Sequence, residues 1–222
     1  TFIEPRFPPN QRFFVKALKD VGATVTAIGE GSKDSLSGEL KSQLSHYEQV
    51  DSVVNQEAVL KAAKFIHARK RIDRLEAVVE AHIMPTAHVR EAMGIAGMSV
   101  QTAFLCRDKP SMKAMLRKGG IPCAQSTAAS SVAEIVDFAK EVGFPLIVKP
   151  RDGAGASGTS RVTNLAELHQ AARELHVDGG RSVAVEEFIE GHEGFYDTIT
   201  MGGRVVHDFA THYYPNVLEA MR

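Results

Sequence analysis

The chain has 222 residues, 44% of them hydrophobic, and a formal net charge of −1. That length suffices for one large or two small domains, and the near-neutral charge gives no electrostatic basis for binding nucleic acid or a membrane surface. No apolar run is long enough to span a bilayer and no signal peptide opens the chain, so we expect a cytoplasmic protein. The two cysteines, Cys106 and Cys123, have no C-x-x-C or metal-ligand spacing, which argues against a disulfide scaffold or a structural zinc site.

The first part of the chain alternates segments typical of strands and helices. Residues 2–5 and 24–28 have strand-like composition, and a helix pattern at 10–21 between them ends at Gly22. Strand, helix and strand in succession indicate a parallel sheet. We therefore assign residues 1–97 to a Rossmann-like α/β domain. Further along this domain, the patterns predict helices at 56–71 and 84–93 and a strand at 75–80.

Capping boxes mark two helix N-termini in the second part of the chain. Ser131 with Glu134 opens one helix, and Asn164 with Glu167 opens another. Between them the sequence predicts a β-hairpin with a glycine-rich tip, and a strand at 182–185 follows the second helix. Because a long glycine-rich tip has few packing partners, we expect this hairpin to act as a mobile cover over a ligand.

The hairpin segment 144–158 reads FPLIVKPRDGAGASG, an apolar strand that delivers Lys149 onto a glycine-rich loop. An ammonium group beside unobstructed backbone N–H groups suits phosphate oxygens. The G-x-G-x-x-G spacing does not indicate a dinucleotide site, because residues 159–163 read as a strand where that site needs a helix. Walker and kinase loops place their lysine after the glycines. A plain hairpin turn stays open as an alternative, although it gives no reason to bury a lysine there.

These motifs, spread over residues 99–215, resemble the first ATP-binding half of the ATP-grasp superfamily. The resemblance rests on a lysine-bearing helix at 108–119, on the Gly-Phe-Pro and apolar run that leads into Lys149-Pro150, and on the VEEFIEG segment at 185–191. It implies that Lys149 is catalytic. It also implies a set of ATP-binding residues: Lys113, Lys149, Gly153, Gly155, Ser157, Gly158, Glu186, Glu187, Phe188, Ile189 and Glu193.

The resemblance gives each of these residues a role. Lys113 and Lys149 contact the phosphates, the loop 153–158 closes over them, the segment 186–189 meets the adenine edge, and Glu193 accepts hydrogen bonds from the ribose hydroxyls. Simpler readings stay open beside these roles. Lys113 lies among other basic residues of one helix, a pattern typical of a solvated face. Acids at a strand end are usually exposed, and the apolar residues of the adenine segment would equally suit a core.

The resemblance also implies a domain organisation. The fold class is α/β, in which the Rossmann-like domain precedes a partial ATP-grasp domain at 98–222, with a lid subdomain at about 124–187 and then the start of the large subdomain. A hairpin turned by Gly202-Gly203 is expected to open the large subdomain. No metal ligand is assigned within the chain, because the family's Mg²⁺ ligands are expected beyond residue 222. This segment alone is therefore expected to be inactive, and the start at Thr1 suggests residues lost upstream.

The function implied is ATP-dependent ligation, with ATP and Mg²⁺ as cofactors. A small carboxylate is activated as an acyl phosphate, and an amine or thiol then displaces the phosphate. Nucleic-acid and membrane partners are not expected, and a homodimer is compatible with the family. Two alternatives stay open: bicarbonate activation as in biotin carboxylases, and a nucleotide-binding module without chemistry.

Overall fold

The computed structural model of the chain describes residues 1–151 and 158–220. They form two compact units, Thr1–Cys106 and Arg107–Arg222, and α5 (Val100–Arg107) is the segment of chain that links them. Each unit has its own sheets and its own core. Among the helices of the described residues, none combines the length and apolar content needed to cross a bilayer.

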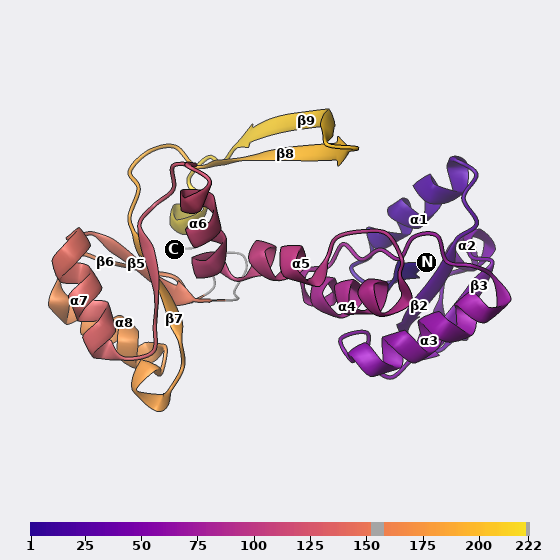
Figure 1. Cartoon of the computed structure of the whole chain (residues 1–222), viewed down its shortest axis with the longest axis horizontal. Coiled ribbons are helices and arrows are strands. Elements are labelled where there is room, and N and C mark those ends of the chain that lie inside the picture. The colour runs from indigo at the N-terminus through magenta and orange to yellow at the C-terminus, as the bar shows by residue number, and fades with distance from the viewer. Residues whose placement is uncertain (152–157, 221–222) are drawn as a thin grey trace. The chain divides into compact units, whose positions relative to one another are not determined.

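The first unit is a three-stranded parallel sheet with helices on both faces (Figure 1). Because neighbouring residues of a strand point to opposite faces, Ile3 and Ile28 pack with α3 and α4, whereas Phe2 and Ala27 pack with α1 and α2. This doubly covered parallel sheet confirms the Rossmann-like prediction. The elements are β1 (Phe2–Ile3), α1 (Gln11–Asp20), β2 (Thr26–Glu30), α2 (Gly38–Gln43), β3 (His46–Val50), α3 (Gln56–Arg69) and α4 (Ile83–Met93), with short 3₁₀ turns at Lys33–Ser35 and Glu80–His82.

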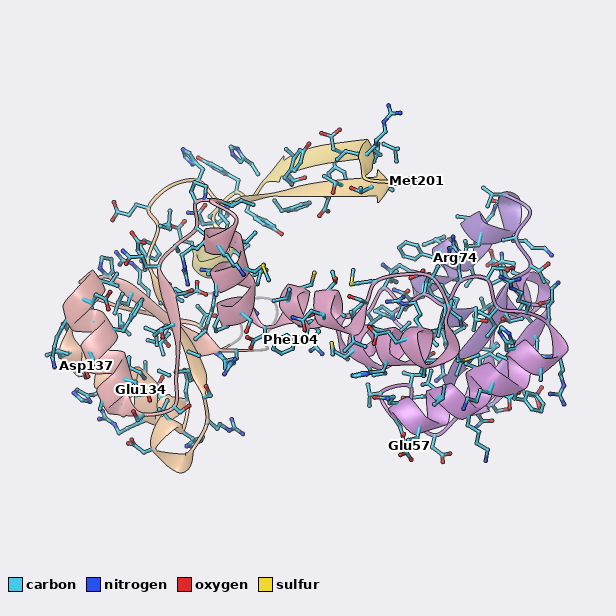
Figure 2. The ribbon with its side chains drawn as sticks, viewed as in Figure 1. Glu57, Arg74, Phe104, Glu134, Asp137 and Met201 are labelled. Carbon is cyan, nitrogen blue, oxygen red and sulfur yellow. The ribbon has the colours of Figure 1, made fainter. Side chains whose placement is uncertain are left out.

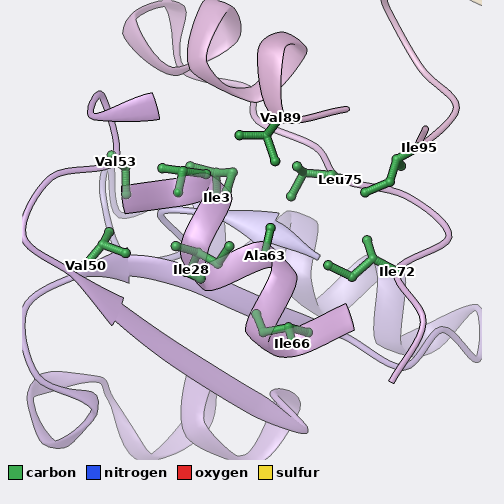
Figure 3. Close-up of a cluster of buried hydrophobic side chains, with 12 residues drawn as sticks. Ile3, Ile28, Val50, Val53, Ala63, Ile66, Ile72, Leu75, Val89 and Ile95 are labelled. Atoms are coloured by element: carbon green, nitrogen blue, oxygen red, sulfur yellow. The ribbon is translucent and has the colours of Figure 1, made fainter. Parts of the chain in front are cut away.

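The larger core cluster of this unit lies between the sheet and the helices α3 and α4. Ile28, Val59 and Leu75 are fully buried there, and Figure 3 shows Ile3, Ile28, Leu75 and Val89 directed toward one another. Burying such side chains contributes roughly 1.5–3 kcal/mol each. This cluster therefore fixes the strands that end at Ile3 and Glu30, from which the chain continues into loops.

One prediction for this unit was wrong, and one strand was not predicted. The strand expected at 75–80 is reduced to a single bridge between Glu76 and Phe2, because its partner β1 has only two residues. The strand β3 was not predicted, since its sequence HYEQV is mostly polar. Tyr47 and Val50 are nevertheless buried, and β3 pairs with β2 over its whole length.

The second unit contains a four-stranded antiparallel sheet in the order β4, β7, β5, β6, hereafter the lid sheet. Its core lies between the sheet and the helices α7 and α8, where Ile135, Leu146, Val148 and Leu168 are fully buried. The predicted order of helix, hairpin, helix and strand is confirmed. The elements are α6 (Lys109–Lys118), β4 (Ser126–Ala129), α7 (Val132–Val142), β5 (Leu146–Pro150), β6 (Ser160–Val162), α8 (Leu165–Glu174), a 3₁₀ turn at Val177–Gly179, and β7 (Val183–Glu187).

The two predicted capping boxes begin α7 and α8, the helices that pack against the lid sheet. The Ser131 hydroxyl accepts a hydrogen bond from the backbone N–H of Glu134, and the Asn164 side chain accepts one from that of Glu167. The carboxylate of each glutamate accepts a hydrogen bond from the backbone N–H of the residue before the cap. In a standard capping box it accepts one from the backbone N–H of the cap residue itself. These contacts hold the two helices that support β5.

A two-stranded hairpin of β8 (Gly194–Met201) and β9 (Arg204–His212) follows, and α9 (Val217–Ala220) comes after it. Gly202 and Gly203 form its turn with φ of +55° and +77°, values that glycine adopts without strain. The predicted hairpin is thereby confirmed, and Figure 2 shows Met201 at its tip.

Candidate functional site

The two faces of the lid sheet differ in chemistry. Leu146 and Val148 of β5 point to the face covered by α7 and α8, so Ile147 and Lys149 point to the opposite face. Glu186 of β7 lies directly opposite Ile147 in the antiparallel register, which places its side chain on the same face as Lys149. Helix α6 lies on this second side of the sheet (Figure 1).

Helix α6 is attached to the end of β5. Asp108 caps the helix by accepting a hydrogen bond from the backbone N–H of Ser111 at 3.1 Å. Arg151, the residue after β5, donates to the same carboxylate from Nη2 at 2.8 Å and from Nε at 3.1 Å. Burial alone would raise the pKa of Asp108, but the hydrogen bonds from Ser111 and Arg151 outweigh it and hold that pKa below its ordinary value. This connection sets where the next turn of α6 presents Lys113.

Lys113 and Lys149 converge on the carboxylate of Glu186. Lys113 Nζ lies 2.8 Å from Oε2, and Lys149 Nζ lies 2.8 Å from Oε1. The side chains of Lys113, Lys149 and Glu186 are 15%, 19% and 8% exposed, so the group is largely withdrawn from water. Two ammonium groups beside one carboxylate leave an excess positive charge on this face. Lys113 and Lys149 are hereafter called the lysine pair.

Burial and charge act together on the pKa values of this group. Burial lowers the pKa of Lys149, the carboxylate of Glu186 partly offsets that effect, and the charges of Lys113 and Lys109 lower it further. Burial would raise the pKa of Glu186, but both lysines outweigh it and lower that pKa. The carboxylate is therefore ionised at neutral pH. Among the described residues, its Oε1 has no polar partner other than the ammonium group of Lys149. An additional anion on this face would balance the charge.

The buried position of Glu186 differs from the simpler reading of exposed acids at a strand end. Glu186 follows Val183-Ala184-Val185 and continues their burial, whereas Glu187 is partly exposed. A carboxylate in such a strand is costly unless it is paired, and that cost was a signal for a cationic partner. The carboxylate of Glu187 accepts a hydrogen bond from the backbone N–H of Gln125 at 3.1 Å.

The other predicted adenine residues lie where β7 ends. The backbone N–H of Phe188 donates to Pro145 O at 3.2 Å, and the guanidinium of Arg161 lies 4.5 Å from the centre of the Phe188 ring. Arg161 Nε is buried and has no hydrogen-bond partner among the described residues. Ile189 is 60% exposed, so it is available to an external group rather than to the core.

The remaining predicted residues divide into described and undescribed ones. The carboxylate of Glu193 accepts a hydrogen bond from the backbone N–H of Val217 at 2.8 Å, which caps α9. Gly158 has φ of +68°, and a Cβ there would lie 3.2 Å from Pro150 Cγ. Gly153, Gly155 and Ser157 lie outside the described residues.

Comparison with known proteins places these residues within one kind of domain. The family model "Carbamoyl-phosphate synthase L chain, ATP binding domain" matches residues 108–195, which include Lys113, Lys149 and Glu186. The L-arginine-specific L-amino acid ligase of Bacillus subtilis is 30% identical over 155 residues, which cover 67% of this chain and 37% of that protein. The chain belongs to the ATP-grasp superfamily. The predicted ATP-grasp resemblance is thereby confirmed.

Other ATP-grasp proteins agree on the fold. The D-alanine–D-alanine ligase of Acidovorax ebreus is 34% identical over 105 residues, which cover 46% of this chain and 31% of that protein. The crystal structure of an L-amino acid ligase from Bacillus licheniformis superposes with a TM-score of 0.73 and 20% identity, covering 95% of this chain and 49% of that one. The chain thus has the fold of a Rossmann-like unit followed by part of an ATP-grasp domain. It spans about half, or less, of the length of these relatives.

Proposed function

We propose that the protein is an ATP-dependent ligase that activates a carboxylate as an acyl phosphate for attack by an amine or thiol. The observation that carries this proposal is the convergence of Lys113 and Lys149, from different elements, on one buried carboxylate with excess positive charge. A triphosphate and an attacking carboxylate are both anionic. Two fixed cations would offset their repulsion without any reorganisation at the moment of reaction.

Each residue of the site has a role in this proposal. Lys113 and Lys149 would contact the phosphates, and Lys149 would be catalytic by stabilising charge as the phosphoryl group transfers. Glu186 would neutralise part of the charge of both ammonium groups before ATP binds. The bound phosphates would then share these ammonium groups with its carboxylate. The segment 186–189 would contact the adenine, and Glu193 the ribose hydroxyls. Gly153, Gly155, Ser157 and Gly158 would cover the phosphates.

ATP and magnesium form the proposed cofactor set, because the matching family model is an ATP-binding domain and one solved relative, a biotin carboxylase domain, is described as a complex with MgADP. Within residues 1–151 and 158–220, no three His, Cys, Asp or Glu side chains are grouped so that they could hold a metal ion. The role proposed for the lysine pair involves no metal-dependent step.

The proposed substrates are small molecules, one carboxylate and one amine. Two relatives are amino-acid ligases by name, which supports this substrate class. We further propose a cytoplasmic location without nucleic-acid or membrane partners; the homodimer stays a prediction. Bicarbonate activation is the second candidate, because a biotin carboxylase domain shares the fold with a TM-score of 0.70.

A substrate panel tests the proposal with the full-length protein. ATP is supplied with single amino acids and with pairs of them, and phosphate release is measured. We expect release that requires both a free carboxylate and a free amine, with little release from ATP alone. Avidin-sensitive fixation of bicarbonate without an amine would instead support the second candidate. ATP binding without phosphate release under any condition would contradict both and favour a module without chemistry.

A further inference from the structure

Helix α6 carries Lys113 but is not anchored by a hydrophobic core. All of its residues, Lys109–Lys118, lie within the described part of the chain, and none of them is buried. Most helices in proteins are stabilised by tertiary packing of an apolar face rather than by their own hydrogen bonds. Since α6 lacks a buried apolar face, polar contacts must hold it beside the lid sheet.

Arginine side chains hold both ends of α6. Near its C-terminal end, Arg117 donates to Ala124 O at 3.2 Å and to Ser126 O at 3.3 Å, which ties the helix to β4. At its N-terminal end, the capping residue Asp108 binds Arg151, the residue that follows β5. The second contact therefore joins the helix that carries one member of the lysine pair to the strand that carries the other.

The geometry of the contact between Asp108 and Arg151 is specific. Oδ2 of Asp108 accepts the capping hydrogen bond from Ser111, whereas Oδ1 accepts both hydrogen bonds from Arg151, so the two tasks of the carboxylate do not compete. The side chains of Arg151 and Asp108 are 33% and 12% exposed. Arg151 Nη1 also donates to Ser182 Oγ at 3.3 Å, and that hydroxyl donates to Ala129 O. A guanidinium held from two sides has a fixed orientation.

Both members of the lysine pair lie close to this contact along the chain. Lys113 comes five residues after Asp108, a rise of about 7.5 Å along the helix axis. Lys149 comes two residues before Arg151, a distance of about 7 Å along an extended strand. Each ammonium group is thus connected to the contact through a short, hydrogen-bonded element. A displacement of Asp108 from Arg151 would change the separation of the two ammonium groups.

We propose that Asp108 and Arg151 are positioning residues, whose contact sets the separation of the two ammonium groups of the lysine pair to suit the phosphates of ATP. This inference rests on the proposed ATP-dependent function. Both residues act through Lys113 and Lys149 and make no contact of their own with the nucleotide. A preorganised pair of cations costs no rearrangement when the anion binds, so loss of the contact weakens binding although both lysines are still present.

Asp108→Asn separates the two tasks of this carboxylate. Asparagine caps helices as well as aspartate does, so its carbonyl oxygen still accepts from Ser111. Its NH₂ group then faces the guanidinium of Arg151, donor against donor, and that contact is lost. Arg151→Gln removes the same contact from the other side. We expect each change to weaken binding of a non-hydrolysable ATP analogue to the full-length protein about tenfold.

The same change in a second background distinguishes positioning from a purely structural role. In a Lys113→Met protein there is no separation left to set, so Arg151→Gln is expected to weaken analogue binding by less than about twofold. A contact that only stabilises the fold would give equal losses in both backgrounds. Equal losses, or unchanged affinity when Arg151→Gln is made alone, would overturn the proposal. Asp108→Asn repeats the comparison should Arg151→Gln fail to fold.

A measurement without nucleotide tests the positioning directly. Lysines are labelled with an amine-reactive reagent, and mass spectrometry gives the rate at each one. The side chain of Lys113 is only 15% exposed, and we expect Arg151→Gln to raise its labelling rate severalfold. Asp137→Asn is the matched control, because Asp137 forms an exposed ion pair with Lys140 on α7 (Figure 2). Unchanged labelling of Lys113 in a folded Arg151→Gln protein would contradict the proposal.

The two measurements separate failure of this inference from failure of the proposed function. If Lys113→Met and Lys149→Met both leave the affinity for the ATP analogue unchanged, the proposed function is wrong, whatever the labelling shows. If these changes weaken binding but Arg151→Gln alters neither affinity nor labelling, the proposed function stands and the positioning role of Asp108 and Arg151 is wrong.

Discussion

Lys149→Ala is expected to lower the turnover of the full-length protein about tenfold to a thousandfold, as removal of a preorganised charge contact does in other enzymes. Lys149 lies on the face of the lid sheet that carries α6, and its charge is largely withdrawn from water. Electrostatic interactions are stronger in such a site than in water. The loss should appear mainly in kcat, because the contact would strengthen as charge moves during phosphoryl transfer. A coupled assay of ADP release measures it.

The control for this change is Lys140→Ala. Lys140 lies on α7 with its side chain 70% exposed, and it forms an ion pair with Asp137 of the same helix. It is expected to leave turnover unchanged. Lys149→Ala should keep its fold, because Glu186 retains Lys113 as a partner. Unchanged ADP release by a folded Lys149→Ala protein would refute the catalytic role.

Glu186→Gln is expected to lower the free energy of unfolding of the second unit by about 3 kcal/mol, the lower end of the range for breaking a buried ion pair. The amide keeps the shape of the side chain but leaves two ammonium groups close together without their counter-charge. Urea unfolding at neutral pH measures the effect. Glu190→Gln is the control, because Glu190 is exposed just beyond β7.

The pH dependence of that difference provides a second readout. The folded-state pKa of Glu186 is lowered, so its stabilising contribution is fully present above the unfolded-state value of about 4.5 and is lost as pH falls through the lowered folded-state value. The gap in stability between the unaltered chain and Glu186→Gln should therefore narrow in acid. A gap that is absent at neutral pH, or constant into acid, would show that the carboxylate does not hold the lysines.

Local signals in the sequence were sufficient for much of the second unit. The capping residues Ser131 and Asn164 and the turn at Gly202-Gly203 act through neighbours in the chain, so their helices and hairpin could be predicted. Lys113 and Lys149 were selected by their resemblance to family motifs. The structure brings both onto one carboxylate, an arrangement that the family resemblance alone did not specify.

What could not be predicted depends on pairing between distant segments. The contact of Glu186 with Lys149 follows from the register of β5 and β7, which is fixed by the core on the other face of the sheet. The strand β3 was missed because its apolar residues are few and its pairing with β2 supplies most of its order.

The central claim is that Lys113 and Lys149 bind one triphosphate together. Its most direct test is the dissociation constant of a non-hydrolysable ATP analogue for the full-length protein, measured for the unaltered chain, Lys113→Met, Lys149→Met and the double variant. We predict that each single substitution weakens binding. The binding free energy lost in the double variant should differ from the sum of the two single losses by about 0.5–3 kcal/mol, as for residues in one network. Strictly additive losses of binding free energy would contradict the claim. A single substitution that leaves the affinity unchanged would contradict it as well.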